Sequence, residues 1–567
     1  MSRNAKILLA AVMLIAAFTR FWHITATPPG LYPDEAMNGN NAVEAMAERH
    51  LKVFYPDNNG REGLFINIQS LFISAFGNEP WALRLPSAIF GTLTVLGLFF
   101  LAELLFRGVK TPHEKLAGMR PSEIIGLAAA FFTAASFWHI NFSRIGFRAI
   151  MAPFFLTWGL YFFFRVYKNV GSANSQIFFA AVGGLLFGLG AHSYIAYRIA
   201  PLLLALPIWT GLKAYYSKAE EQSGRREGCF PCMVAFFFFF AFIAVLPLGI
   251  YFLKHPGDFL GRTSQISIFT ETSPIELLAI NTAKTIGMFW VYGDGNWRHN
   301  FAAAPELAPP VGIFFLLGII FALKSFFLRG SFAKVPEKFN AAFLLLWLFL
   351  MLAPVVISSE HLPHALRAII AIPPVMILTA FGLWVIIDKT AWWLKKQKNV
   401  YPDFSVQLDR IGKELAAGLF LLSILMTIHA GDRYLDRWAN HPRTDDAFAG
   451  RDWRLTQYLR GLDANAEKYV LIEGERIDER IVTISAQSVL FGTGTFLPDA
   501  RAAKKFTYLS PEELEARLTG PSAYSPEHAY IVSLKKDNIE FLDKLREKLP
   551  NIIATAPLDF IVLELRK

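Results

Sequence analysis

Charge is scarce in this chain. Only 18% of its 567 residues are Asp, Glu, Lys or Arg, whereas 54% are hydrophobic and 15% are aromatic. A soluble chain of this length is more polar, so the composition predicts a polytopic membrane protein. The formal net charge of +9 is typical of the Lys and Arg excess in cytoplasmic loops, and we do not interpret it as a nucleic-acid-binding surface.

Cysteine is nearly absent. The two cysteines are Cys229 and Cys232 in "CFPC", so no disulfide framework exists elsewhere in the chain. Their spacing matches a thioredoxin motif, but no βαβ pattern surrounds it, which argues against a redox enzyme. We expect a structural pair of thiols at a helix end.

Nucleotide-binding motifs and internal repeats are missing as well. The chain has no GxGxxG sequence, no P-loop and no solenoid or heptad period. Its apolar runs are almost free of acids, with Glu103 as the main exception near the end of its run. A transporter or lipid flippase more often carries mid-membrane charges and repeated halves, so that class is an alternative rather than the first choice.

Long apolar runs are what the chain does contain. A membrane-spanning helix needs about 20 mostly apolar residues. The first run has the basic start of a signal peptide but no clear small-residue cleavage site, so we expect an uncleaved helix. Eleven spans are predicted, at residues 5–24, 81–106, 122–139, 149–167, 176–193, 198–215, 230–253, 309–328, 341–358, 368–388 and 414–430.

Basic residues suggest the orientation of these spans. If all eleven cross the membrane, the connections that carry most Lys and Arg share one side with the N-terminus, and that side is cytoplasmic. We therefore expect a multi-pass protein of the cell inner (plasma) membrane with its C-terminus outside. The residues concerned are Arg3, Lys6, Arg107, Lys110, Lys115, Arg120, Arg165, Lys168, Lys213, Lys218, Arg225, Arg226, Lys324, Arg329, Lys334, Lys338, Lys389, Lys395, Lys396 and Lys398.

The predicted domains are a membrane domain, residues 1–430, and an extracytoplasmic α/β domain, residues 431–567. The membrane domain has two long outer loops, residues 25–80 and 254–308. In the second domain, "KYVLIEG", "KFTYL", "AYIVSL" and "FIVLELRK" have the composition of strands, and "SPEELEARL" and "DNIEFLDKLREKL" that of helices. We expect this domain to have a structural or acceptor-recognition role.

Two adjacent acids, Asp34 and Glu35 in "GLYPDEAMNGNN", follow the first span on the outer side. A carboxylate at the membrane surface can act as a general base on a hydroxyl or an amine. The same acids also suit the first turn of a helix, where they cap its N-terminus. The two roles are compatible, and we treat the pair as the candidate catalytic site.

Arginines in the outer segments run against the positive-inside trend. They are Arg61, Arg144, Arg148, Arg198, Arg262, Arg298 and Arg367. A bound anion is one physical reason for such arginines, because a guanidinium grips phosphate with forked hydrogen bonds. Several can instead pair with acids or lipid headgroups. We expect Arg61, Arg198 and Arg367 to contact a phosphate.

Histidines and aromatic residues also gather in the outer segments. "WRHN" and "EHLPHALR" place His299, Glu360, His361 and His364 where a divalent metal is conceivable, but the spacing is not a zinc signature and a proline interrupts it. We therefore predict no cofactor and no metal ligand. We instead expect Tyr55, Tyr194, His299, Glu360 and His364 to form hydrogen bonds with the acceptor or the sugar.

The segments "PPGLYPDEA", "YPDNNGREGLFINI" and "PWALRLPSAIFGTLTVLGLFFLAELLF" resemble membrane glycosyltransferases of the GT-C class. The likeness is to the bacterial branch related to protein O-mannosyltransferases and lipid A aminoarabinose transferase (glycosyltransferase family 39/83-like). It covers roughly residues 5–390. It implies a GT-C fold with about eleven transmembrane helices.

The resemblance also implies a reaction. A sugar would pass from a polyprenyl-phosphate carrier to a lipid, protein or glycan acceptor outside the cytoplasm, with inversion, and Asp34 would take the acceptor's proton beside Glu35. Relatives often have Lys-Pro-Pro-Leu or His-Pro-Pro-Leu where this chain has "REGL", which makes Arg61 the corresponding basic residue. The outer link "NFSRIGFR" carries no second acid. An oligosaccharide ligase or polymerase would share the phosphate site and is a further alternative.

Overall fold

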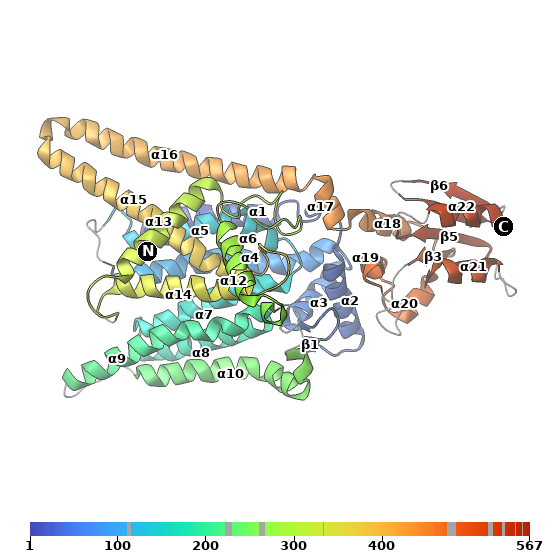
Figure 1. Ribbon diagram of the computed structural model, residues 1–567, viewed down its shortest axis with the longest axis horizontal. Coiled ribbons are helices and arrows are strands. Elements are labelled where there is room, and N and C mark those ends of the chain that lie inside the picture. The colour runs from blue at the N-terminus through green and yellow to red at the C-terminus, as the bar shows by residue number, and fades with distance from the viewer. Residues whose placement is uncertain are drawn as a thin grey trace. The chain divides into compact units, whose positions relative to one another are not determined.

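The computed structural model describes residues 1–109, 115–221, 229–259, 267–332, 334–472, 483–519, 526–535, 539–549, 551–557 and 560–566. The chain forms two compact units. The first contains Met1–Trp22, Val53–Phe65 and Ser87–Trp438, and the second contains His23–Lys52, Ile66–Pro86 and Ala439–Lys567. Figure 1 shows the elements of both units.

The first unit is a bundle of long helices. Among the described residues, ten helices are long and apolar enough to cross a membrane, and all ten lie on predicted spans. The protein is therefore a multi-pass membrane protein. These helices are α1 (Arg3–Phe21), α4 (Pro80–Phe106), α7 (Met151–Tyr167), α8 (Ala173–Leu189), α9 (Ala205–Glu221), α10 (Phe230–Lys254), α13 (Pro309–Phe326), α14 (Pro336–Val356), α15 (Ile372–Val400) and α16 (Ser405–Gly431).

The predicted span at 122–139 is shorter than expected. It forms α5 (Pro121–Ala134), only 14 residues long, and then α6 (Phe137–Phe142). The buried Arg20 explains where α5 ends, because its guanidinium donates to the carbonyls of Thr133 at 3.1 Å and Ala134 at 3.2 Å. Carbonyls in the last turn of a helix lack the usual partner four residues on, and the arginine donates to these two.

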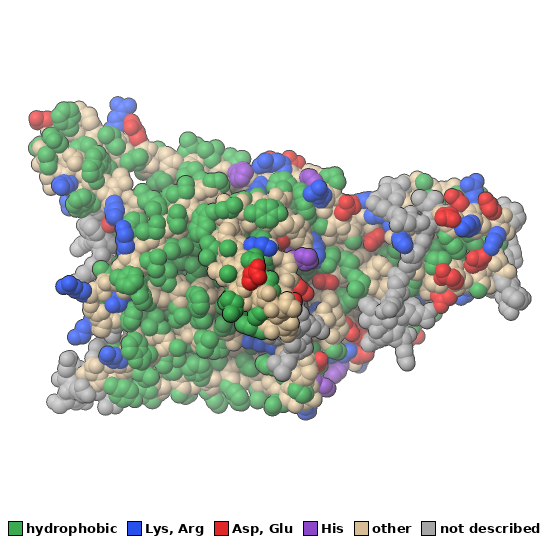
Figure 2. Space-filling model, viewed as in Figure 1, with side chains coloured by type: hydrophobic (Ala, Val, Ile, Leu, Met, Phe, Trp, Pro, Cys, Tyr) green, Lys and Arg blue, Asp and Glu red, His purple; other side chains and the backbone are tan. Residues whose placement is uncertain are grey.

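Glycines let the helices of the bundle approach closely. A Cβ at Gly184 of α8 would lie 2.1 Å from the carbonyl oxygen of Phe237 in α10. A Cβ at Gly318 of α13 would lie 2.0 Å from the carbonyl oxygen of Leu378 in α15. Such close backbone contact is typical of helices packed in a membrane. The side chains on the outside of the bundle are largely hydrophobic, as Figure 2 shows.

The N-terminus and the α13–α14 and α15–α16 connections lie at one end of the bundle (Figure 1). Lys and Arg side chains gather at that end in Figure 2. These are connections that the sequence assigned to the cytoplasm. The orientation of the protein in its membrane stays a prediction.

Cys229 and Cys232 form a disulfide. The sequence placed the pair at a helix end, and Cys229 is indeed the residue that caps α10. The expectation of two thiols was wrong, because one turn at the start of a helix brings the side chains at positions i and i+3 together.

Short elements complete the first unit. Strands β1 (Phe54–Tyr55) and β2 (Arg61–Glu62) form an antiparallel hairpin. The segment from residue 254 to residue 308 contributes α12 (Pro274–Gly287). The single turns and irregular helices are η1 (Arg148–Ile150), η2 (Gly190–His192), η3 (Ile195–Leu204), η4 (Ile268–Thr270), η5 (Ile369–Ala371), η6 (Pro402–Phe404) and the π-helical η7 (Asp432–Trp438).

The second unit combines the first outer loop with the C-terminal region. The predicted helical runs of the loop form α2 (Pro33–Ala47) and α3 (Leu64–Phe76). Against α2 packs α19 (Gln487–Thr493), with the ring of Phe491 over Gly39 and a hydrogen bond of 2.8 Å from Asn40 Nδ2 to Gln487 Oε1. Ser488 Oγ also donates to the carbonyl of Leu31 at 2.7 Å. No local sequence pattern predicted this pairing.

The C-terminal region has the predicted α/β character. Its sheet has the order β4-β3-β5-β7-β6, with β4, β3 and β5 parallel and β7 and β6 antiparallel. Apolar clusters cover both faces. The strands are β3 (Glu467–Leu471), β4 (Phe506–Leu509), β5 (His528–Ser533), β6 (Ile552–Thr555) and β7 (Val562–Arg566), and the other helices are α17 (Pro442–Ala447), α18 (Gly450–Arg460), η8 (Ile484–Ala486), α20 (Pro498–Ala503), α21 (Pro511–Thr519) and α22 (Ile539–Lys548).

Candidate functional site

The acidic pair lies in the first turn of α2, directly after Pro33. Glu35 is fully buried, whereas Asp34 is partly exposed. The Glu35 carboxylate receives Arg84 Nε on Oε1 and Arg84 Nη2 on Oε2, both at 2.9 Å. This is a bidentate, charge-assisted pair, the strongest form of arginine–carboxylate contact.

Arg84 fixes more than Glu35. Its Nη1 donates to the carbonyl of Pro28 at 2.6 Å and its Nη2 to the carbonyl of Gly30 at 2.9 Å. Gly30 has a φ of +62°, and a Cβ there would lie 2.4 Å from the carbonyl oxygen of Phe448. The segment from residue 28 to residue 35 is therefore held by its backbone and by one buried side chain. That arrangement keeps Asp34 in a fixed position at the start of the helix.

A second arginine–carboxylate pair lies in the first unit, at the β1–β2 hairpin. Glu62 is buried, and its Oε2 accepts Arg148 Nε at 2.8 Å. Arg148 Nη2 reaches the carbonyl of Gly60 only at 3.5 Å. Arg61 and Tyr55 are partners in the same hairpin, and both are buried. The "REGL" sequence thus places a buried cation and a buried anion at consecutive positions of β2.

An apolar groove runs between α8 and α10, also in the first unit. Its walls include Phe187, Phe242 and Leu248, and among the described residues Arg198 of η3 is the charged residue that lines it. The Arg198 guanidinium lies 4.2 Å above the ring of Phe259. Its Nη1 donates to the carbonyl of that residue at 2.8 Å. A groove of this kind suits a ligand with a long apolar tail and an anionic head.

Arg198 forms no ion pair with any acid in the part of the chain that the structure describes. Tyr194, the residue before η3, is buried. The positive charge of Arg198 thus lies against aromatic faces and a carbonyl, and Glu62 acts on it electrostatically without forming an ion pair. This leaves its charge available to an anion.

Three ligand-bearing side chains of the first unit meet between the segment that follows α12 and the loop that follows α14. One ligand atom each from Asp294, His299 and His364 can be chosen so that all lie within 4.8 Å of one another. His299 Nδ1 lies 2.9 Å from Asp294 Oδ2, and His364 Nδ1 lies 3.8 Å from the same oxygen. The backbone N–H of Ala365 also donates to this oxygen at 2.8 Å.

Burial and charge in this cluster favour the protonation states in which its side chains bind a metal ion. Burial alone would raise the pKa of Asp294, but the hydrogen bond and charge of His299, with smaller effects from His364 and Asn296, lower it overall. Burial and then the charge of His299 lower the pKa of His364 well below its usual value. An ionised carboxylate beside a neutral imidazole could hold a divalent ion. This cluster therefore argues against the prediction, made from the sequence, that the protein has no metal ligand.

A buried acid lies next to this cluster. Glu306 Oε1 accepts the backbone N–H of Asp294 at 3.0 Å, while no hydrogen-bond partner for Oε2 lies among the described residues. Burial raises the pKa of Glu306 to about 8. The Asp294 N–H and the charge of Arg433 oppose this shift, and the charge of Asp294 adds to it. The side chain is therefore mainly protonated at neutral pH.

The remaining predicted residues fall in several places. Arg367 forms an ion pair with Glu360 on the same loop, so the two are brought together, and His361 is exposed. Asp34 and Glu35 belong to the second unit, whereas all other predicted site residues belong to the first. Arg262 lies outside the described residues.

Sequence reasoning missed two residues of these clusters. Arg84 stands in "WALRLPS", and its only signal was a charge inside an apolar helix, which usually needs a buried partner. Asp294 stands in "GDGNWRHN", five residues before His299. Reading that acid together with the histidine would have suggested the cluster.

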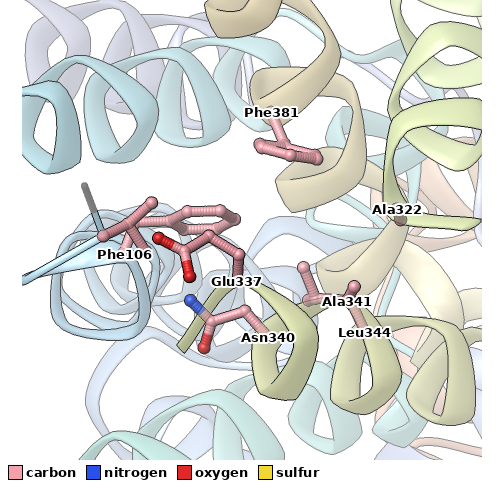
Figure 3. A pocket seen from close by; sticks show the side chains of 8 residues that line it. Phe106, Ala322, Glu337, Asn340, Ala341, Leu344 and Phe381 are labelled. Atoms are coloured by element: carbon pink, nitrogen blue, oxygen red, sulfur yellow. The ribbon is translucent and has the colours of Figure 1, made fainter. Parts of the chain in front are cut away.

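A small second pocket lies between α4, α13, α14 and α15 (Figure 3). Phe106, Leu344 and Phe381 give it apolar walls, and Glu337 and Asn340 of α14 supply its polar atoms. None of the predicted site residues lines it.

The comparisons with known proteins bear on the fold. No family model matches the chain, and no curated protein matches it in sequence. Among solved structures, ArnT from Cupriavidus metallidurans bound to undecaprenyl phosphate is similar over 98% of this chain and 97% of its own, at 13% identity and a TM-score of 0.51. The apo form of ArnT gives 12% identity, the same coverage and a TM-score of 0.50.

A more distant likeness is to the oligosaccharyltransferase AglB from Archaeoglobus fulgidus. It covers 99% of this chain and 74% of AglB, at 14% identity and a TM-score of 0.48. The ArnT structures show that the chain has the GT-C fold, as the sequence resemblance implied.

Proposed function

We propose that the protein transfers a sugar from a polyprenyl-phosphate carrier to an acceptor at the extracytoplasmic face of the membrane. The observation that carries this proposal is the start of α2, where a partly exposed Asp34 stands beside a Glu35 that Arg84 holds rigidly. A fixed carboxylate next to a solvent-accessible space suits a general base. Support also comes from the ArnT structure of the same fold, which was solved with undecaprenyl phosphate bound.

The proposed reaction is a single displacement with inversion. An acceptor hydroxyl or amine attacks the anomeric carbon, the bond from that carbon to the phosphate oxygen breaks, and Asp34 takes the acceptor's proton. The lipid phosphate leaves with the bonding electrons. Arginines stabilise the negative charge that grows on it in the transition state.

Roles differ among the predicted residues. Arg198 is the first candidate for the donor phosphate, because it lines an apolar groove and has no carboxylate partner among the described residues. Arg61 and Arg367 are proposed as further phosphate contacts. Glu35 is assigned a positioning role, since Arg84 occupies both of its oxygens. Tyr55, Tyr194, His299, Glu360 and His364 remain proposed contacts to sugar or acceptor.

A divalent ion fits the cluster of Asp294, His299 and His364, whose nitrogen and oxygen donors suit Zn²⁺ and related ions. When bound there, such an ion would supply a positive charge that can polarise a substrate oxygen. The displacement above requires no step through it.

The test is mass spectrometry of lipids, glycans and glycoproteins from membranes that contain the wild-type chain or Asp34→Asn. The wild type is expected to form a glycosylated product that the variant does not form. The matched control is Glu48→Gln, which changes an exposed acid just after α2. Full product formation by Asp34→Asn would refute the assignment, and lipid movement across the bilayer without any glycosidic product would favour a flippase.

A further inference from the structure

The β1–β2 hairpin packs against the end of the helix that walls the groove. The ring of Phe54 in β1 lies 5.0 Å from that of Tyr251 and 5.3 Å from that of Phe252, both in α10. Phe252 lines the groove, and Arg198 lies 5.3 Å above its ring. Because Glu62 is paired with Phe54 across the hairpin, its carboxylate lies at the same end of the groove as Arg198.

Glu62 brings negative charge to that end. It is buried, it pairs with Arg148 at 2.8 Å, and it interacts electrostatically with Arg198 and His192. A site designed only to bind an anion would not place a buried acid among its cations, because like charges repel strongly when water is excluded. The presence of Glu62 therefore raises the question of which anion the site selects.

The proposed donor and its product differ in charge. The phosphate of a glycosylated carrier is a diester with one negative charge. The phosphate that is left after transfer is a monoester, whose second proton is lost near pH 6 and which carries between one and two negative charges at neutral pH. The two lipids share the same tail, so charge at the head is the feature that distinguishes them.

We propose that Glu62 is a charge filter at the mouth of the groove. Arg198 and Arg148 attract either phosphate, and Glu62 repels the more negative monoester more strongly than the diester. The spent carrier then leaves, and the glycosylated carrier takes its place. The occupant named here rests on the proposed function, but the charge preference belongs to the site itself.

The first experiment uses the wild-type protein in lipid nanodiscs. The probes are undecaprenyl phosphate and its methyl ester, a diester with one charge, titrated at pH 7.5 and quantified by native mass spectrometry. Undecaprenyl phosphate is expected to bind less than tenfold more tightly than the methyl ester, because Glu62 offsets part of the attraction of the two arginines for the more negative head. A site of arginines alone prefers the more negative head, so undecaprenyl phosphate binding tenfold more tightly than the ester would refute the filter.

The second experiment removes the charge. Glu62→Gln is expected to bind undecaprenyl phosphate about tenfold more tightly than the wild type and the methyl ester only about threefold more tightly, because the repulsion scales with the charge of the head. The matched control is Glu414→Gln, which neutralises an exposed acid paired with Arg410 in α16 and should leave both affinities unchanged. Arg198→Gln should weaken both probes. Equal shifts for the two probes in Glu62→Gln, or no shift, would refute the role of Glu62.

These measurements separate the filter from the reaction. Binding of the two probes requires no acceptor and no transfer. If the probes show the expected preference while no glycosylated product is found, the proposed function fails and the charge filter stands. If product is formed but the preference is absent, the filter fails alone.

Discussion

Two arginine–carboxylate pairs, one in each unit, are built differently. Glu35 in the second unit accepts hydrogen bonds from two nitrogens of Arg84. Arg84 also donates to the carbonyls of Pro28 and Gly30. Among the described residues, Glu62 in the first unit accepts a hydrogen bond within 3 Å from Arg148 Nε alone. Both acids are buried.

The difference separates two uses of a buried charge. An ion pair in which every donor and acceptor has a hydrogen-bond partner holds the surrounding backbone in place. Removing one partner of such a pair leaves an uncompensated buried charge. A pair joined by one contact can exchange that contact for another anion at lower cost. We infer that the Glu35 pair supports the position of Asp34, while the Glu62 pair takes part in binding.

The largest expected effect tests whether Asp34 and Glu35 have separate roles. Asp34→Asn should lower kcat by about 10²–10⁴-fold, the range of a general base, without changing thermal stability. Glu35→Gln should lower the Tm as well, because its carboxylate holds Arg84. Initial rates and thermal unfolding of both detergent-solubilised variants check this. Equal loss of Tm in the two variants would contradict the division of roles.

The next effect compares the two arginines directly. Arg84→Gln should destabilise the protein by about 3–5 kcal/mol, because Glu35 and two carbonyls lose their partner in a buried setting. Arg148→Gln should cost about 1–2 kcal/mol, since it breaks one short contact in a partly exposed side chain. Denaturant-induced unfolding monitored by tryptophan fluorescence measures both. Equal destabilisation would remove the basis of the comparison.

Local sequence patterns predicted what depends on local periodicity. Of the eleven predicted spans, ten form long helices among the described residues, and "SPEELEARL" predicted α21 with Ser510 at its start, where Ser510 Oγ accepts the N–H of Glu513. The pairing of Glu35 with Arg84 spans 49 residues, and that of Asp294 with His364 spans 70. No local period encodes such contacts, because tertiary packing creates them.

Short or irregular elements escaped prediction for a related reason. Strand β6 (Ile552–Thr555) is an edge strand whose last three residues are exposed, so it lacks the apolar alternation of a strand. The end of α5 is fixed by Arg20, which is far away in sequence. The roles of Asp34 and of the arginines came from the family resemblance and stay predictions.

A third, intermediate effect concerns Asp294, whose contacts are neither as complete as those of Glu35 nor as few as those of Glu62. His364→Ala should weaken Zn²⁺ binding at least about tenfold, because one of three ligands is lost. His361→Ala, in the same loop but exposed, should not change it. Equilibrium dialysis of the purified protein with Zn²⁺ measures this. Identical binding by both variants, or no stoichiometric ion in the wild type, would contradict a metal site.

The smallest effect tests a fully engaged group that carries no charge. Tyr508 in β4 is buried, its hydroxyl lies 2.7 Å from Thr495 Oγ1, and burial raises its pKa to about 12 despite the hydrogen bonds of Thr495 and Thr493. Tyr508→Phe should cost about 1 kcal/mol at neutral pH, the typical value of one hydrogen bond.

The sign of the pH dependence follows from that pKa. The folded protein holds the Tyr508 proton up to about pH 12, whereas an unfolded tyrosine releases it near pH 10. The stability from this group is therefore complete below pH 10 and is lost as the pH rises through 12. Unfolding of the wild type and Tyr508→Phe at pH 9 and pH 11 should show a steeper loss in the wild type, while Tyr401→Phe, at an exposed position, should follow the wild type. If the wild type and Tyr508→Phe lose unfolding free energy in parallel as the pH rises, the buried Tyr508 hydroxyl does not contribute the expected pH dependence.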